Sequence, residues 1–173
     1  VTDFDLHRLW VQPGVAGYCV ASDEIAFRLR EALPEVRVEV TGIAVMPVFA
    51  SPAPRAECAR ELSLQPDRLT AMVMTGGAGL ASGAAMVERL LRLPGALQVV
   101  AIAGRNAPLL ASYEALAKQH PGRLVPLGFT TTIERVMAAS DLCVTKPGGL
   151  STSECLALGL PMIMMGDEVR RTQ

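Results

Sequence analysis

The segment from Asp141 to Met165, DLCVTKPGGLSTSECLALGLPMIMM, constrains this chain more than any other. An apolar run predicted to be a strand leads into a Gly-rich turn, which begins a predicted helix carrying Thr152 and Glu154. This order places free backbone N–H groups and the positive end of a helix dipole at the carboxyl end of a strand, where a diphosphate can bind. The carboxylate of Glu154, about one helical turn further on, can accept hydrogen bonds from a ribose. The segment therefore predicts a nucleotide-sugar site.

The rest of the chain predicts an α/β fold with a Rossmann-like parallel sheet, because strands and helices alternate with short loops. Residues 17–21 and 36–41 are expected to be strands flanking a helix at 23–33. A proline-rich connector at 42–54 follows, and we place a domain boundary there, between residues 1–48 and 49–173. Beyond it, strands are predicted at 69–75, 97–103, 123–127, 141–145 and 161–165, and helices at 55–63, 80–92, 107–119, 131–139 and 150–158.

Composition excludes several classes of function. The net charge is −1, which argues against a nucleic-acid binder. No apolar run approaches the roughly 18–20 residues that span a bilayer, and no signal-peptide pattern begins the sequence. The four cysteines are scattered without CxxC spacing, which predicts reduced structural thiols in a cytoplasmic protein rather than disulfides or a zinc site.

Two predicted strands end in residues that suit a ligand. Gly76, Gly77 and Gly79 follow the strand at 69–75 and allow close approach of the backbone, although a simple tight turn would need the same glycines. Arg105 and Asn106 follow the strand at 97–103. The arginine can pair with a phosphate and the asparagine can bind a base edge; the alternative is a solvated arginine beside an asparagine helix cap.

Two further strand ends have the same character. Gly128 and Phe129 can present backbone groups to a planar base, unless Phe129 simply belongs to the core. The turn at 146–149 lacks the GxxxxGK[ST] order of a P-loop, so ATP or GTP hydrolysis is not indicated. A capping box, with Ser151 as N-cap and Glu154 at N3, is the structural alternative for the helix that follows.

The motifs VTDFDLHRLW, GRN, LGF, TKPGG-LSTSE and GLPMI, in this order, resemble the monogalactosyldiacylglycerol synthase and diacylglycerol glucosyltransferase family, which includes the diglucosyldiacylglycerol synthases. The resemblance runs from Val1 to about Met165. That family consists of two-domain GT-B glycosyltransferases related to the peptidoglycan N-acetylglucosaminyltransferase. It implies that residues 1–48 end an acceptor-side domain and that residues 49–173 form a UDP-sugar-binding domain, incomplete at its C-terminus.

The resemblance also implies roles for the residues at the strand ends. Gly128 and Phe129 would receive the uracil, and Glu154 the ribose hydroxyls. The diphosphate would meet the turn and first helical residues, namely Gly148, Gly149, Ser151 and Thr152. The interdomain cleft would be lined by Gly76, Gly77 and Gly79, with Arg105 and Asn106 beside the nucleotide.

His7 and Trp10 match the TDFxxHxxW segment near the family's cleft, so His7 is a candidate acid/base unless the segment only packs the loop. The Gly-rich loop with a histidine and the PxPGQE-like loop of the family have no counterpart here. We therefore expect an internal or truncated piece, with the main base outside it.

The expected activity is transfer of a hexose from a UDP-sugar to a diacylglycerol-type lipid, with inversion. No cofactor and no obligatory metal are expected, because no DxD-like acidic pair lies near the turn at 146–149. The expected location is cytoplasmic, with possible peripheral contact at the inner face of the membrane. The alternatives are an isomerase like UDP-N-acetylglucosamine 2-epimerase and a non-catalytic nucleotide-binding module.

Overall fold

The computed structural model describes residues 5–75, 82–95 and 97–165. Contacts within the chain divide it into two compact units. One comprises residues 1–46 together with 148–153, and the other comprises residues 47–147 together with 154–173. The division near the N-terminus thus falls inside the proline-rich connector, between Met46 and Pro47.

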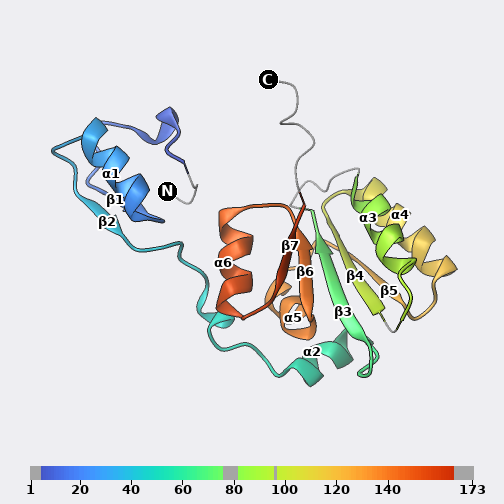
Figure 1. Ribbon diagram of the computed structural model, residues 1–173. Helices are drawn as coiled ribbons and strands as arrows, with labels where there is room; N and C mark the ends of the chain where they lie inside the picture. Colours follow the sequence, from blue (N-terminus) through green and yellow to red (C-terminus); the bar gives the residue numbers. More distant parts are fainter. Residues whose placement is uncertain (1–4, 76–81, 96, 166–173) are drawn as a thin grey trace. The chain divides into compact units, whose positions relative to one another are not determined.

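In the first unit, one helix packs on two parallel strands (Figure 1). Tyr18 lies opposite Val38 in the pairing of β1 with β2. The small core contains Val20, Ile25, Ala26, Leu29 and Val38. The elements are η1 (Arg8–Trp10), β1 (Tyr18–Val20), α1 (Asp23–Ala32) and β2 (Val38–Val40).

The second unit is built on a parallel sheet of five strands in the order β5-β4-β3-β6-β7. Reversal of the strand order between β3 and β6 is typical of doubly wound α/β domains. Its elements are η2 (Pro47–Phe49), α2 (Arg55–Glu61), β3 (Leu69–Met74), α3 (Ser82–Leu91), β4 (Leu97–Gly104), α4 (Ala107–Gln119), β5 (Leu124–Gly128), α5 (Ile133–Ala139), β6 (Leu142–Thr145), α6 (Gly149–Ala157) and β7 (Met162–Met164).

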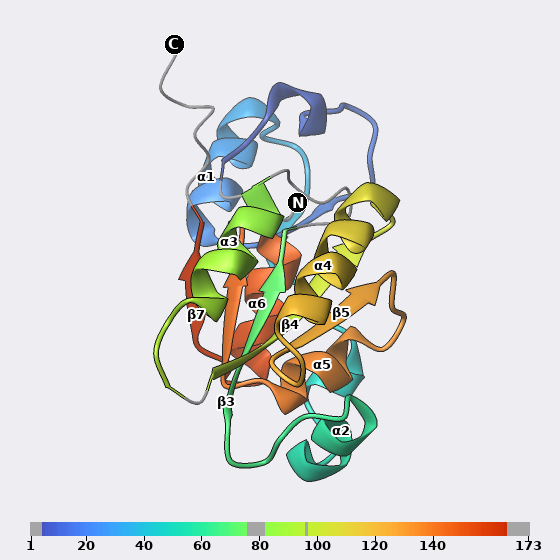
Figure 2. The ribbon, with the colours of Figure 1, turned by 90° about the vertical axis from the view of Figure 1, so that its right-hand side faces the viewer.

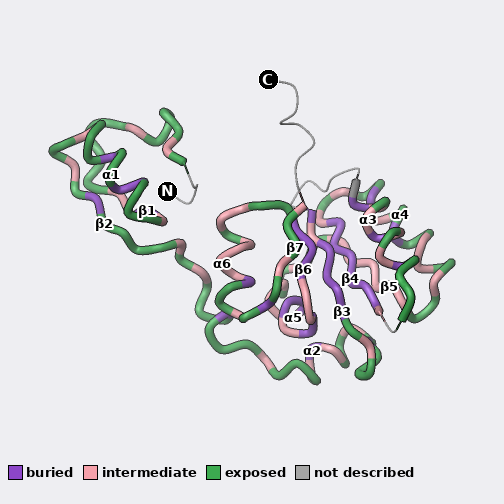
Figure 3. The backbone as a smooth tube through the Cα atoms, in the orientation of Figure 1, coloured by how far each residue is buried: buried purple, intermediate pink, exposed green. Residues whose placement is uncertain are grey.

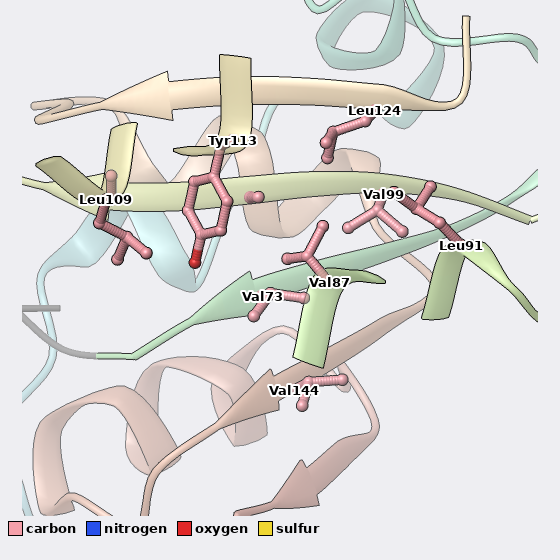
Figure 4. Close-up of a cluster of buried hydrophobic side chains, with 10 residues drawn as sticks. Val73, Val87, Leu91, Val99, Leu109, Tyr113, Leu124 and Val144 are labelled. Atoms are coloured by element: carbon pink, nitrogen blue, oxygen red, sulfur yellow. The ribbon is translucent and has the colours of Figure 1, made fainter. Parts of the chain in front are cut away.

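Helices cover both faces of this sheet. Helices α3 and α4 lie on one face, and α5 with residues 154–157 of α6 lies on the other (Figures 1 and 2). The inner strands β3 and β4 are therefore buried along almost their whole length (Figure 3). Between the sheet and α3/α4 lies a core of aliphatic side chains around the ring of Tyr113 (Figure 4).

The α/β class and the Rossmann-like parallel sheet predicted from the sequence are confirmed. The α-helices and strands found within the described residues are the expected ones, with ends that differ by at most two residues. The two short 3-10 helices, η1 and η2, are not predicted by the sequence, and η2 lies inside the proline-rich connector at 42–54. Agreement is close because strands buried on both faces are uniformly apolar, and because glycine, proline and polar residues separate them from amphipathic helices.

An ion pair links the start of α2 to the start of β6. The Arg55 guanidinium contacts both carboxylate oxygens of Asp141, at 2.6 and 2.8 Å. The same carboxylate accepts a hydrogen bond of 2.7 Å from the backbone N–H of Thr70, at the start of β3. The pKa of Asp141 is lowered, mainly by its hydrogen bonds to Arg55, so the bonded, ionised form is the one the fold favours.

This pKa shift predicts a loss of stability in acid. Because the folded-state pKa of Asp141 lies below the unfolded value, its contribution is complete above about pH 4 and is lost as the pH falls through the folded-state pKa. We expect Asp141→Asn to lower the free energy of unfolding by roughly 1–2 kcal/mol at pH 7. The expected loss is smaller than for a fully buried ion pair, because Arg55 is half exposed and water screens the interaction. Urea titrations from pH 7 to pH 2 should show this difference shrinking below about pH 4.

A matched control is Glu88→Gln, which breaks the exposed pair between Glu88 of α3 and Arg92, the residue after that helix. Exposed pairs of this kind contribute about 0.3–0.5 kcal/mol. A difference between wild type and Asp141→Asn that stays constant down to pH 2 would contradict the assignment.

Candidate functional site

The carboxyl ends of the parallel strands lie along one edge of the sheet, and the candidate residues follow them. Met74 of β3 is opposite both Ile102 of β4 and Thr145 of β6. Gly104 of β4 is opposite Gly128 of β5. The loops after β4, β5 and β6 therefore all begin at this edge, where ligands of open α/β sheets bind. The predicted cleft residues Gly76, Gly77 and Gly79 lie outside the described residues.

Two of the predicted site residues contact each other directly. The Arg105 guanidinium lies over the ring of Phe129, 4.6 Å from its centroid. Both residues are exposed, with Phe129 at 61%, so the alternative that Phe129 belongs to the core is wrong. The pair joins the loops after β4 and β5 through a cation–π contact, and both its members have planar faces on which a base can stack. The sequence places the two residues at separate strand ends and gives no sign of this pairing.

Asn106 and Gly128, which adjoin Arg105 and Phe129, each have a structural role at α4. The Asn106 side chain caps α4 by accepting a 3.0 Å hydrogen bond from the Leu109 N–H. The helix-cap alternative is thus confirmed for Asn106, and contact of Asn106 with a base edge stays a prediction. A Cβ added to Gly128 would lie 3.4 Å from Leu110 Cδ2, so the end of β5 lies close against α4.

Helix α6 begins earlier than a capping box requires. Its first residue is Gly149, and the Thr152 N–H donates to the Gly148 carbonyl at 3.0 Å. Gly148 is therefore the N-cap and Ser151 lies inside the first turn, so the capping-box alternative is wrong. The first N–H groups of α6 have no acceptor within the helix, as at any helix start. A Cβ added at Gly148 would meet nothing within 4 Å.

Glu154 lies in the second turn of α6, and its side chain is half buried. Burial raises the pKa of its carboxyl group. Among the residues that the structure describes, none forms a hydrogen bond or an ion pair with this carboxylate. A partly buried acid without a partner is typical of ligand sites, because a ligand can supply the missing donors.

The next residue, Cys155, is buried, as is Cys143 of β6. The neighbouring Cys155 thiol, together with burial, raises the pKa of the Cys143 thiol. The structure has no disulfide among Cys19, Cys58, Cys143 and Cys155, all of which lie within the described residues.

His7 has a local structural role in the first unit. Its Nδ1 accepts a hydrogen bond of 3.2 Å from the Leu9 N–H and caps η1. The side chain is exposed. This contact supports the loop-packing alternative, and an acid/base role for His7 stays a prediction.

No three metal-ligating side chains converge within residues 5–75, 82–95 and 97–165. The same ranges contain no helix with the length and apolar character that crossing a bilayer requires.

The fold and this edge define a class: a Rossmann-like α/β domain with a candidate ligand site at the carboxyl ends of its strands. Residues 70–169 match the glycosyltransferase family 28 C-terminal domain, and residues 1–45 match the monogalactosyldiacylglycerol (MGDG) synthase family. The chain belongs to glycosyltransferase family 28, with an MGDG synthase segment before its C-terminal domain. The resemblance seen in the sequence is thereby confirmed.

Curated relatives agree with this assignment. The chain is 32% identical over 165 residues to the processive diacylglycerol beta-glucosyltransferase of Bacillus pumilus (strain SAFR-032), covering 95% of this chain and 43% of the relative. It is also 32% identical over 167 residues to the enzyme of the same name from Staphylococcus haemolyticus (strain JCSC1435), covering 95% and 42%. The chain thus spans less than half the length of these relatives.

Solved structures show the same fold. WaaG, a glycosyltransferase involved in lipopolysaccharide biosynthesis, superposes with a TM-score of 0.60 at 16% identity, covering 91% of this chain and 46% of WaaG. A glycosyltransferase from Rickettsia africae ESF-5 gives a TM-score of 0.57 at 13% identity, covering 91% and 47%.

Proposed function

We propose that this chain contributes the donor-binding part of a glycosyltransferase that moves a hexose from a UDP-sugar to a diacylglycerol-type lipid. Two curated relatives carry the name diacylglycerol beta-glucosyltransferase, which supports the acceptor class and the sugar transfer. The observation that carries the donor site is the stack of Arg105 on Phe129 at the same sheet edge as the loop into α6. In this proposal residues 49–173 bind the donor, and residues 1–48 belong to the acceptor side.

Each part of UDP has a matching group. The uracil would stack on the Arg105–Phe129 pair, whose exposed ring and guanidinium offer planar surfaces. The diphosphate would accept hydrogen bonds from the N–H groups at the start of α6, where the helix dipole favours negative charge. The ribose hydroxyls would donate to the Glu154 carboxylate.

This arrangement would assist transfer by stabilising the leaving group. As the bond between sugar and diphosphate breaks, negative charge grows on UDP. The proposed binding mode puts the α6 N-terminus beside the diphosphate, where this charge develops. A general base must remove the proton of the acceptor hydroxyl, and His7 is the candidate within this chain. We expect no obligatory metal, and we expect contact with the membrane surface to be peripheral.

Calorimetric titration with UDP tests the donor site directly. We expect saturable binding of UDP and weaker binding of uridine, which lacks the diphosphate.

Incubation with UDP-glucose or UDP-galactose and diacylglycerol vesicles then tests transfer, with release of UDP as the readout. UDP binding without transfer would favour the non-catalytic nucleotide-binding module, and interconversion of free UDP-sugars would favour the isomerase. An absence of UDP binding would refute the proposal for this chain.

Removal of the Glu154 carboxylate should weaken UDP binding. We expect Glu154→Ala to cost about 1–3 kcal/mol of binding free energy, as for the loss of a charged hydrogen-bond partner. Because burial raises the folded-state pKa of this acid, its ionised form disfavours folding at neutral pH, so the variant should be at least as stable as wild type at pH 7. Glu114→Ala, in which an exposed acid of α4 is removed, is the matched control. Equal UDP affinity in Glu154→Ala and Glu114→Ala would remove Glu154 from the site.

A further inference from the structure

The hydroxyl group of Tyr113 lies in the protein interior without a hydrogen-bond partner among the described residues. Tyr113 is in α4, and its side chain is fully buried in the core between the sheet and α3. Buried polar atoms in native proteins are nearly always paired, so each exception calls for an explanation. Phenylalanine would fill the same space in the core without carrying an unpaired hydroxyl.

The hydroxyl points toward the carboxyl end of β3, as Figure 4 shows. A Cβ added to Gly83, in the first turn of α3, would lie 2.6 Å from the Tyr113 oxygen and 3.3 Å from Thr75 Cγ2. The phenolic oxygen thus lies beside the first turn of α3 and close to Thr75, which directly follows β3. The absence of a side chain at Gly83 leaves room for it.

This position is on the ligand-binding side of the sheet. Met74, the last residue of β3, is opposite Thr145 of β6, and the turn into α6 begins directly after Thr145. Ligands of doubly wound sheets bind outside the carboxyl ends of the central strands, where helix N-termini meet the phosphates. The hydroxyl therefore lies beneath the edge at which UDP is proposed to bind.

We propose that Tyr113 is a positioning residue for the donor: its hydroxyl forms its missing hydrogen bond at the first turn of α3 when a nucleoside diphosphate occupies this edge. The inference rests on the proposed function, because it assigns the trigger to the diphosphate of the same site. The hydroxyl acts through α3 and touches no reacting atom.

The chemistry of a buried phenol suits this role. Burial raises the pKa of Tyr113 to about 12, so the phenol stays uncharged at neutral pH, and its oxygen can accept a hydrogen bond from an N–H group that the first turn of a helix leaves unpaired. The ring is fully buried in the cluster that also contains Val73, Val87, Ala101 and Leu109, so little side-chain entropy remains to be lost when the bond forms.

Tyr113→Phe tests the inference, because it removes one oxygen and leaves the packed ring. We expect the melting temperature of the ligand-free chain to stay the same or rise, since a buried unpaired group is removed. We expect the Kd for UDP to increase about five- to tenfold, the effect of losing one hydrogen bond. Binding of uridine, measured by NMR titration, should not change, because uridine has no diphosphate.

Tyr18→Phe is the matched control in the first unit. The Tyr18 hydroxyl accepts from the Gln12 N–H at 2.9 Å and donates to the Gln12 carbonyl at 3.0 Å. Removing this paired hydroxyl should lower the melting temperature and leave the Kd for UDP unchanged. The two variants should thus differ in the sign of the stability change and in the affinity for UDP.

Gly83→Ala provides a second test of the same contact. Its added Cβ must displace the Tyr113 oxygen, and in Tyr113→Phe that oxygen is absent. We expect Gly83→Ala to raise the Kd for UDP in the wild-type background and to have little further effect in Tyr113→Phe.

Two results would overturn the inference while leaving the proposed function intact. One is equal UDP affinity in wild type and Tyr113→Phe. The other is a parallel loss of stability and of affinity for both UDP and uridine, which would indicate a purely structural hydroxyl. If the wild-type chain itself does not bind UDP, the proposed function fails, and the role of Tyr113 fails with it.

Discussion

Gly148→Val is expected to weaken UDP binding about 100-fold, or about 2.7 kcal/mol, while leaving the fold intact. Gly148 is the N-cap of α6, and a Cβ added there meets nothing within 4 Å in the ligand-free chain. Its φ is not in the left-handed region, so a side chain causes no backbone strain. If the diphosphate binds at this helix start, the valine methyl groups would occupy the space that its oxygens need. Calorimetry with UDP measures the effect.

Two variants serve as controls for the Gly148 substitution. Gly148→Ala adds a single methyl group and should give an intermediate loss of affinity. Ala157→Val adds bulk at the exposed far end of the same helix and should leave UDP binding unchanged. The melting temperature of Gly148→Val should fall only slightly, since valine is a poorer N-cap than glycine. Full UDP affinity in Gly148→Val would show that this turn does not hold the phosphate.

The fold could be predicted closely because its signals are local. The strand at 69–74 is an apolar run interrupted only by Thr70, and the helix at 107–119 starts at an asparagine cap, so each element can be recognised from its own residues. The βα alternation then leaves few topologies, because crossovers between parallel strands are right-handed.

The site could be predicted only in part, since its contacts join segments far apart in the sequence. The sequence places both Arg105 and Phe129 at strand ends, and nothing in it indicates that one lies on the other. The sequence does not single out Tyr113, because a tyrosine in an apolar helix face predicts only core packing. Serine favours the N-cap position, which makes Ser151 a candidate, whereas the observed N-cap is Gly148, three residues earlier, within the Gly-rich turn.

At the amino ends of the strands, opposite the proposed donor site, the side chain of Gln98 contributes to stability and not to binding. Gln98, near the start of β4, is only 2% exposed. Its side-chain amide donates to the Gln65 carbonyl and to Thr70 Oγ1, both at 2.9 Å, and its oxygen accepts from the Gln65 N–H at 3.0 Å. The amide thereby holds the segment before β3 against the amino end of the sheet.

Gln98→Leu should therefore lower the free energy of unfolding by about 3–4 kcal/mol, because it leaves three polar partners without their bonds and one of them, Thr70, is buried. Urea denaturation measures the loss. Gln119→Leu, at the exposed end of α4, is the matched control and should change stability by less than about 0.5 kcal/mol. Since Gln98 lies at the amino edge and the proposed donor site at the carboxyl edge, the Kd for UDP of the folded variant should match that of wild type. A large loss of UDP affinity at temperatures where Gln98→Leu is still folded would mean that the two edges are coupled, contrary to the assignment of binding to the carboxyl edge alone.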